Sequence, residues 1–356
     1  MHRVAAKIKQ FRAFLNHHRM AAILIAGAVG IAVVGNVAMA MLGQPLPHLI
    51  ADITIKPKEK YYAPLTGLEV KDKAAPTKPV TAIMIENFDP DARPQSGLKQ
   101  AETVYETIAE GGITRFLALY QQNKPQLIGP VRSLRPYYLD WAKPYDAGIV
   151  HVGGSANALA TVRNGQWRDL DQFFNAGAYW RSSDRYAPHN VYTSFAKLDA
   201  LEAAKNYTSS APKPMLRTDA KRPAQPTATQ IAVHMSSAEY DSSYGYDQAS
   251  NTYLRSQGGG PHVDREEGQI APTVVIVMKV PMREIMEETW RESMQTIGTG
   301  YAVIFQNGTA TEVTWHKNSA DEQLSFTDKD NKPFGLARGQ TWITAIPSDQ
   351  GTVTWK

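Results

Sequence analysis

The hydrophobic and polar positions divide the chain into one long apolar stretch and two regions of short, interrupted elements. Residues 20–42 contain no Lys, Arg, Asp or Glu, and this run is long enough to cross a bilayer as a helix. Five basic residues precede it, so the positive-inside rule predicts a cytoplasmic basic tail over 1–19, a transmembrane anchor over 20–42 and an extracytoplasmic remainder. A cleaved signal peptide is the alternative, because residues 38–40, Ala-Met-Ala, match the pattern of a cleavage site.

A proline-rich stalk over residues 43–60 leads into a region, 61–205, where strand and helix patterns alternate. Short apolar, β-branched runs predict strands at 80–85, 113–121, 125–129 and 148–152. Helices are expected after the capping residues Ser96, Ser155 and Ser194, and from Pro136 onward. The first of these helices would present Leu98, Ala101, Tyr105 and Ile108 on one face. This alternation predicts an α/β N-terminal domain.

A second proline-rich segment, 206–228, predicts a linker, and residues 229–356 consist mainly of strand patterns. The expected strands lie at 231–235, 252–256, 273–280, 301–305, 311–315, 323–326, 341–346 and 352–355. Asn307-Gly308 is typical of a two-residue hairpin turn. The charged run 282–295 fits a strand or a helix, and its charge density favours a helix. The whole pattern predicts a mainly-β C-terminal domain, so the fold class is α/β plus mainly β, preceded by one transmembrane helix.

The charge distribution argues against nucleic-acid binding. Five of the 38 basic residues and none of the 34 acidic residues lie in residues 1–40, so the rest of the chain carries almost no net charge. The hydrophobic content of 43% and charged content of 20% are those of a globular protein with a core.

The chain contains no cysteine, which excludes an acylated lipoprotein cysteine, disulfides, thiolate metal sites and every cysteine nucleophile. Neither the G-x-S-x-G nucleophile elbow nor the H-E-x-x-H zinc motif occurs. We therefore expect no metal and no cofactor.

Polar groups follow three of the predicted strands of the first domain. In open α/β sheets, ligands gather beyond the carboxyl ends of parallel strands, so these groups are expected to share one edge. Two arginines there could grip a carboxylate or phosphate, and a Gly-Gly-Ser turn could offer backbone N–H groups. The candidates are Arg93, Ser96, Arg132, Ser133, Arg135, His151, Gly153, Gly154 and Ser155, with Arg185 and His189 in a loop that could cover them.

A structural alternative stays open for each candidate. Arginines at strand ends commonly pair with nearby acids, here Glu106, Glu110 or Asp140, and His151 in an apolar strand fits a buried structural histidine.

Several long runs resemble the YerB-like family of lipoproteins, which contain a domain of unknown function. The matching runs are PLTGL, ARPQSGLKQAETVYETIAEGGITRFLALYQ, IGPVRSLRPYYLDWA, HVGGS, RYAPHNVY and, near the C-terminus, GQTWI. The resemblance spans roughly residues 61–356 and implies a two-domain extracytoplasmic protein tethered to a bacterial membrane, without supplying a reaction. Unlike the lipoproteins, this chain lacks the acylated cysteine, so the apolar helix would replace the tether. The matching runs contain Arg93, Ser96, Glu106, Glu110, Arg115, Arg132, Ser133, Arg135, His151 and His189.

Two functions remain as hypotheses. The first is a membrane-anchored envelope protein that binds an anionic cell-wall component or a wall-synthesis partner protein. The second is a hydrolase or transferase acting on such a polymer, with Glu106 or Glu110 as acid or base and His151 or His189 as proton carrier.

Overall fold

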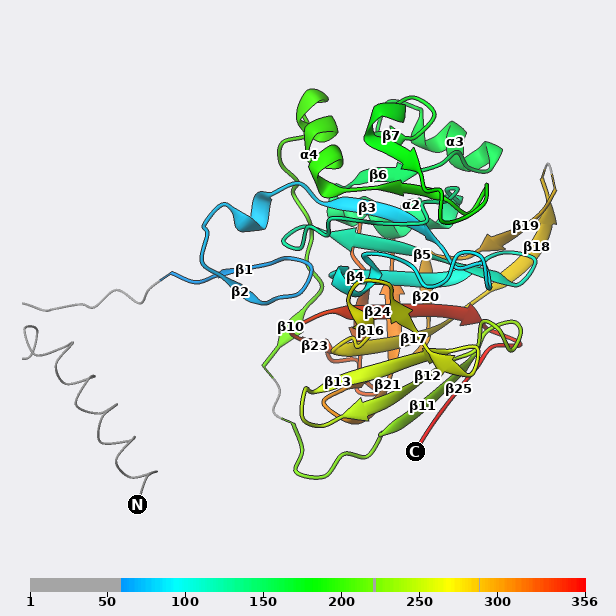
Figure 1. Cartoon of the computed structure of the whole chain (residues 1–356). Helices are drawn as coiled ribbons and strands as arrows, with labels where there is room; N and C mark the ends of the chain where they lie inside the picture. The colour runs from blue at the N-terminus through cyan, green and yellow to red at the C-terminus, as the bar shows by residue number, and fades with distance from the viewer. Residues whose placement is uncertain (1–58, 220–221, 288) are drawn as a thin grey trace, which may run out of the picture. The chain divides into compact units, whose positions relative to one another are not determined.

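A ten-stranded mixed sheet runs through both of the segments that the sequence separates (Figure 1). Its order is β22-β21-β20-β17-β24-β4-β5-β3-β6-β7. The strands are β3 (Thr81–Glu86), β4 (Thr103–Glu110), β5 (Ile113–Tyr120), β6 (Gly148–His151), β7 (Arg168–Asp171), β17 (Val274–Val280), β20 (Gly298–Gln306), β21 (Thr309–Lys317), β22 (Ser325–Thr327) and β24 (Thr341–Pro347). β24 pairs in parallel with β4, which joins the late strands directly to the early ones.

This computed structural model describes residues 59–219, 222–287 and 289–356. The predicted tail and anchor, and the stalk up to residue 58, lie outside the described residues. Within the described ranges, no helix has the length and apolar character needed to span a membrane.

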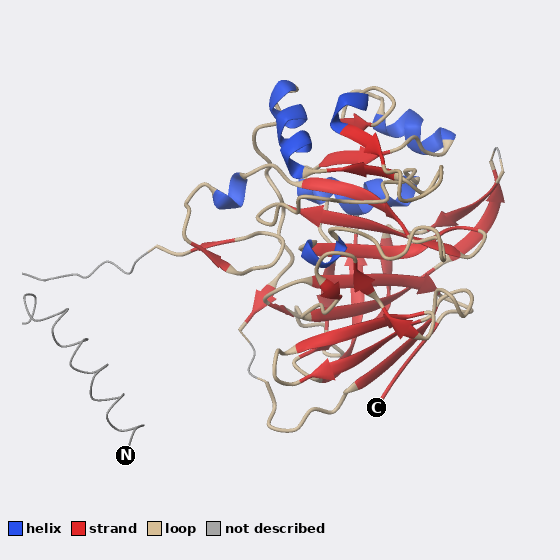
Figure 2. Ribbon diagram, in the orientation of Figure 1, coloured by secondary structure: helices blue, strands red, loops and turns tan. Residues whose placement is uncertain are grey.

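Three short helices cover the two faces of the β3-β6-β7 end of the sheet. They are α2 (Pro136–Ala142), α3 (Ala156–Val162) and α4 (Phe195–Ala204). Tyr138 and Trp141 of α2 pack with Met84 in one hydrophobic core. Phe195 and Leu198 of α4 belong to a second core. Helices and strands both occur in this region, as predicted, but strands dominate the described chain and the helices are few (Figure 2).

A second, five-stranded sheet packs against one face of the first, since residues of both sheets share the core that also contains α4. Its order is β14-β13-β12-β11-β25. The strands are β11 (Gln230–His234), β12 (Ser242–Asp247), β13 (Thr252–Gln257), β14 (Gly260–Pro261) and β25 (Thr352–Trp355). Residues 231–355 therefore build a two-layer, mainly-β part, as the strand patterns predicted.

The remaining elements are short. Two-stranded pairs are formed by β1 (Tyr61–Tyr62) with β2 (Glu69–Val70), β8 (Tyr179–Arg181) with β9 (Val191–Thr193), β15 (Val263–Asp264) with β16 (Gly268–Gln269), and β10 (Arg217–Thr218) with β23 (Leu336–Ala337). The 3₁₀ turns are η1 (Ala75–Thr77), η2 (Leu98–Gln100), η3 (Lys143–Tyr145) and η4 (Ala176–Ala178). β10 lies in the proline-rich segment after residue 206, so that segment is partly paired with late residues.

The helix predicted after Ser96 is wrong: only the 3₁₀ turn η2 forms there, and the chain continues as strand β4. β4 lies between β24 and β5, and its side chains alternate between two cores, with Val104 in one and Tyr105 in the other. Apolar residues spaced three and four apart also fit a strand buried on both faces, and sheet pairing decides between the two. The run 125–129 forms only isolated bridges instead of a strand.

The charged run 282–295 forms a hairpin, not the helix that its charge density favoured. β18 (Met282–Met286) and β19 (Trp290–Met294) pair antiparallel, with Glu284 opposite Glu292. Figure 1 shows this hairpin projecting beyond the sheets. Met282 and Met294 pack on the core at its base, which anchors the strand pair. The hairpin predicted at Asn307-Gly308 is confirmed, because Gln306 and Thr309 pair across it.

Candidate functional site

One carboxylate, that of Glu110, binds three arginines. Arg115 donates Nη2 to Glu110 Oε1 at 3.2 Å, and both Arg135 and Arg291 donate to Oε2. These arginines come from β5, from the residue before α2 and from β19, respectively. The cluster therefore joins residues about 180 positions apart in the chain and carries three positive charges against one negative.

A bulge in β4 sets the direction of the Glu110 side chain. The register between β4 and β5 shifts between Ile108 and Glu110, and a bulge of this kind re-aims the side chains next to it. Arg135 stands at the extended position before Pro136, which starts α2. Strands β4 and β5 therefore hold Glu110 and Arg115, the start of α2 holds Arg135, and the hairpin brings the third arginine, Arg291.

The electrostatics of the cluster favour the charged carboxylate. Burial alone raises the pKa of Glu110, but Arg115 and Arg135 outweigh it and lower the pKa to about 2. Burial and the neighbouring Arg115 lower the pKa of Arg135. Three guanidinium groups in one place repel each other, so the cluster is a favourable place for a further negative charge.

A cavity of about 240 Å³ opens beside this cluster. Arg135, Tyr137, Ser155, Arg291 and Glu292 are among its lining residues. Arg135 Nε, Arg291 Nε and Ser155 Oγ are buried atoms without a hydrogen-bond partner in the described part of the chain. A buried donor without a partner costs roughly 1–3 kcal/mol, so a ligand that meets these donors on the residues lining the cavity would stabilise the arrangement.

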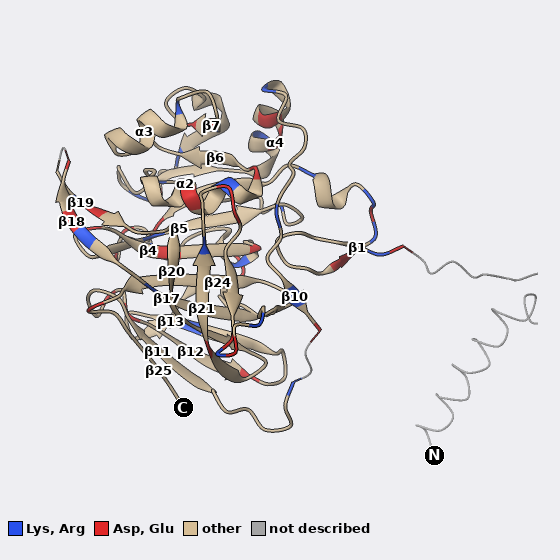
Figure 3. Cartoon of the chain, turned by 180° about the vertical axis from the view of Figure 1, so that it is seen from behind, with Lys and Arg blue, Asp and Glu red and all other residues tan. Residues whose placement is uncertain are grey.

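Carboxylates line the other parts of the same cavity. Asp140 accepts a hydrogen bond from the Thr296 hydroxyl, and Glu287 accepts one from the Asn157 backbone N–H at 2.9 Å. Glu292 also lines it. Basic and acidic positions accordingly lie close together on the β18–β19 hairpin (Figure 3). The cavity therefore combines cationic and anionic side chains with apolar ones such as Ile285 and Met294, and its arginines are the ones that bind Glu110.

Arg132 does not join Arg135 at this cavity. Its Nε lies 3.0 Å from Glu86 Oε1, and His189 Nδ1 contacts the same oxygen at 3.0 Å. His189 also stacks on Phe88. We expected both arginines to bind one ligand. The structure does not bring them together, because the two guanidinium groups are bound to different carboxylates.

His151 is fully buried in β6, where its ring nitrogens face the Gly153 carbonyl at 2.8 Å and Asp169 at 3.0 Å. The Gly153 N–H donates to Asp171, and the Ser155 N–H donates to the Leu134 carbonyl. These N–H groups of the Gly153-Gly154-Ser155 turn are therefore committed to the protein itself, contrary to the expected anion cradle. His151 matches the structural alternative.

Glu106 is fully buried in a polar network that connects early and late parts of the chain. Arg255 donates to Glu106 Oε1 at 2.9 Å, and Trp342 Nε1 donates to Oε2 at 2.9 Å. Arg255 continues to His262, whose pKa burial holds well below its usual range. Glu106 has no exposed surface, so it cannot meet a polymer as an acid or base.

The remaining candidates bind backbone or loops. Arg93 donates to the Asn87 side chain at 3.0 Å, and Arg185 donates to the Asp91 and Pro94 carbonyls. The Ser96 hydroxyl donates to Glu266, while the Ser133 carbonyl accepts from Arg115. These contacts fix loop positions beside the sheet.

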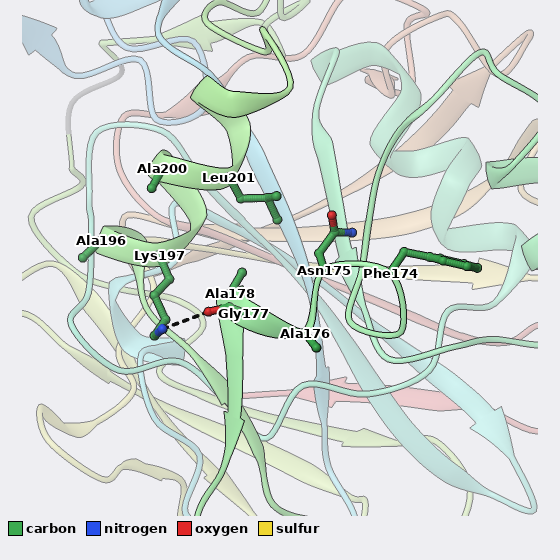
Figure 4. A pocket seen from close by; sticks show the side chains of 9 residues that line it. All are labelled: Phe174, Asn175, Ala176, Gly177, Ala178, Ala196, Lys197, Ala200 and Leu201. Atoms are coloured by element: carbon green, nitrogen blue, oxygen red, sulfur yellow. Dashed lines mark hydrogen bonds between the residues drawn. The ribbon is translucent and has the colours of Figure 1, made fainter.

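A larger hollow, of about 510 Å³, lies between η4 and α4 (Figure 4). Alanines, Phe174 and Leu201 form most of its lining, and Lys197 already donates its Nζ to the Gly177 carbonyl at 2.9 Å. Few polar groups converge there. Among the described residues, no group of three or more His, Asp or Glu side chains could hold a metal ion.

Sequence reasoning found Glu110, Arg115, Arg135 and Ser155 but missed Arg291 and Glu292. Both missed residues lie in the run that was expected to be helical. The only signal near them was the mixture of apolar and charged residues in the run 282–295. That mixture does not reveal which residue either side chain pairs with.

Comparisons with known proteins agree with this architecture. Residues 65–209 match the family model described as "Protein of unknown function (DUF3048) N-terminal domain", and residues 231–343 match its C-terminal domain. The protein named "Putative lipoprotein YerB" of Bacillus subtilis (strain 168) is 32% identical over 295 residues, which cover 81% of this chain and 87% of that protein. The crystal structure of YerB from Bacillus subtilis matches with a TM-score of 0.73 at 29% identity, covering 83% of this chain and 100% of the other. The chain therefore belongs to the YerB-like family, and it matches both the N- and the C-terminal DUF3048 domain models.

Proposed function

We propose that this protein is a membrane-tethered, extracytoplasmic protein that binds an anionic component of the cell envelope in the cavity beside Glu110. The observation that carries the proposal is that Arg135, Arg291 and Ser155 line one cavity and that each has a buried donor atom, Arg135 Nε, Arg291 Nε or Ser155 Oγ, without a partner in the described chain. An oxyanion of a carboxylate or phosphate group would accept from all three.

The tether rests on two observations. Residues 20–42 form an uncharged apolar stretch preceded by basic residues. The Bacillus subtilis relative carries the word lipoprotein in its name. A protease added to intact cells should cut residues 59–356 if they face outward, while full protection that is lost on lysis would contradict the orientation.

The hydrolase alternative receives less support. Of its four candidate residues, Glu106 and His151 are fully buried and Glu110 is held as an anion by arginines. His189 and Glu86 lie in contact, but neither residue lines the arginine cavity. A proton carrier needs access to its substrate, so we favour binding over catalysis.

Titration calorimetry with ethyl phosphate tests the binding site in the full chain, purified in detergent. We expect measurable binding that weakens by about tenfold or more in Arg291→Ala, because a hydrogen bond to a charged group contributes about 1.5–3 kcal/mol. Arg283→Ala is the matched control: it removes the same charge from an exposed position of the same hairpin.

An equal loss of affinity in Arg283→Ala and Arg291→Ala would show that binding depends on the overall charge of the protein and not on this cavity. An unchanged affinity in Arg291→Ala would refute the proposal that the anion binds in this cavity. Acetate in place of ethyl phosphate distinguishes a carboxylate ligand from a phosphate ligand.

A further inference from the structure

The cavity beside Glu110 has a second, oppositely charged side that the anion site does not use. Glu292 on β19 lines this cavity together with Arg135. The Tyr137 hydroxyl lies within electrostatic reach of both groups: burial raises its pKa, Arg135 lowers it and Glu292 raises it. Cationic and anionic groups of the protein therefore act on the same small volume.

Glu292 is the carboxylate of this cavity that lacks a partner within the described residues. Of the other carboxylates that line the cavity, Asp140 binds Thr296 and Glu287 binds the Asn157 N–H, while Glu110 beside the cavity binds arginines. The side chain of Glu292 makes no hydrogen bond or ion pair in residues 59–219, 222–287 and 289–356, and the residue is only partly exposed.

The neighbours of Glu292 make its negative charge costly. Glu284 lies directly opposite on β18, and like charges in directly opposed strand positions repel. Burial, and then Glu284, raise the pKa of Glu292. The adjacent Arg291 is bound to Glu110, so it does not relieve this repulsion. A positive group supplied from outside would do so.

We propose that the ligand is a zwitterion: an oxyacid anion held by Arg135, Arg291 and Ser155, whose ammonium group binds Glu292. This inference rests on the proposed function and adds the ligand class to it. A simple polyanion would meet repulsion from Glu292, whereas an ammonium group turns that repulsion into attraction. The volume of about 240 Å³ fits a small head group or terminal substituent, because larger ligands occupy pockets of roughly 300–1,000 Å³.

A matched pair of probes isolates the ammonium group. O-Phosphoethanolamine and ethyl phosphate share the phosphomonoester and differ by the amine. With the full chain in titration calorimetry, we expect O-phosphoethanolamine to bind at least tenfold tighter. In Glu292→Gln this preference should disappear, with weaker binding of O-phosphoethanolamine and unchanged or tighter binding of ethyl phosphate. Glu284→Gln, which removes the same charge from the exposed opposite strand, should keep the preference.

Two further comparisons distinguish the sources of such a zwitterion. Glycerophosphoethanolamine carries the phosphodiester of a lipid head group, and β-alanine paired with propionate carries a carboxylate in place of the phosphate. Tightest binding of the diester would assign a lipid head group, and a preference for β-alanine over propionate would assign an amino acid substituent.

Failure of the proposed function and failure of the zwitterion inference give different results. If wild-type protein binds neither phosphates nor carboxylates, the proposed function itself is refuted. If it binds O-phosphoethanolamine and ethyl phosphate equally, the anion site stands and the zwitterion inference is overturned. A preference that persists in Glu292→Gln also overturns the inference, since another group would then bind the amine.

Discussion

The buried carboxyl of Glu202 should make the stability of this protein fall as the pH rises toward neutrality. Glu202 lies on α4 with 2% of its surface exposed. Its Oε1 accepts from the Thr81 hydroxyl at 3.0 Å, while Oε2 is buried without a hydrogen-bond partner in the described chain. Burial raises the pKa of Glu202 from 4.5 to about 7, although the bond from Thr81 lowers it.

The direction of this pH dependence follows from the proton affinity of Glu202 in the folded and unfolded states. The folded state holds the Glu202 proton more tightly than the unfolded state, so the stabilisation is fully present below pH 4.5 and is lost as the pH rises to about 7. Each tenfold change in proton affinity corresponds to about 1.4 kcal/mol, so the total loss is about 3 kcal/mol.

Urea unfolding followed by tryptophan fluorescence at pH 5, 6, 7 and 8 measures this loss. We expect Glu202→Gln to gain about 2–3 kcal/mol over wild type between pH 5 and pH 8, because the amide cannot ionise. Asp199→Asn is the control, since Asp199 is exposed on the same helix and pairs with Lys124 at 2.6 Å. Parallel pH profiles of wild type and Glu202→Gln would refute the reasoning.

Two further predictions concern contacts between segments that are distant along the chain. Arg255→Met should cost about 3–5 kcal/mol in urea unfolding by leaving the Glu106 charge buried, and adding Glu106→Gln should recover part of that loss. A double variant at least as unstable as the sum of the single ones would contradict this pairing. Gly308→Ala should lower the melting temperature, because its φ is +74° and a Cβ would lie 2.6 Å from the Tyr246 ring. Gly165→Ala, with a similar φ of +87° but open space, should lower it less, and equal effects would exclude the Tyr246 contact as the cause.

Local patterns predicted much of the fold. The strands at β3, β5, β6 and β17, the helices that begin at Pro136 and after Ser194, and the turn at Asn307-Gly308 follow from side-chain periodicity and from capping and turn chemistry. The helix expected after Ser155 also forms, but without a capping bond from the Ser155 side chain. Those preferences act within a few residues of each other. Where an element is decided by its partner strands, as in β4 and the β18–β19 hairpin, the same reasoning gave the wrong element.

The candidate site shows the same division. The sequence by itself determined the uncharged stretch at 20–42, the absence of cysteine chemistry and the helix starts beside which Arg135 and Ser155 lie. Only the tertiary structure decided that Arg135 meets Glu110 and Arg291, whereas Arg132, three residues earlier, meets Glu86. The physical reason is range: propensity acts between near neighbours in the chain, while charge pairing depends on distances in space that are set by sheet order and hairpin placement.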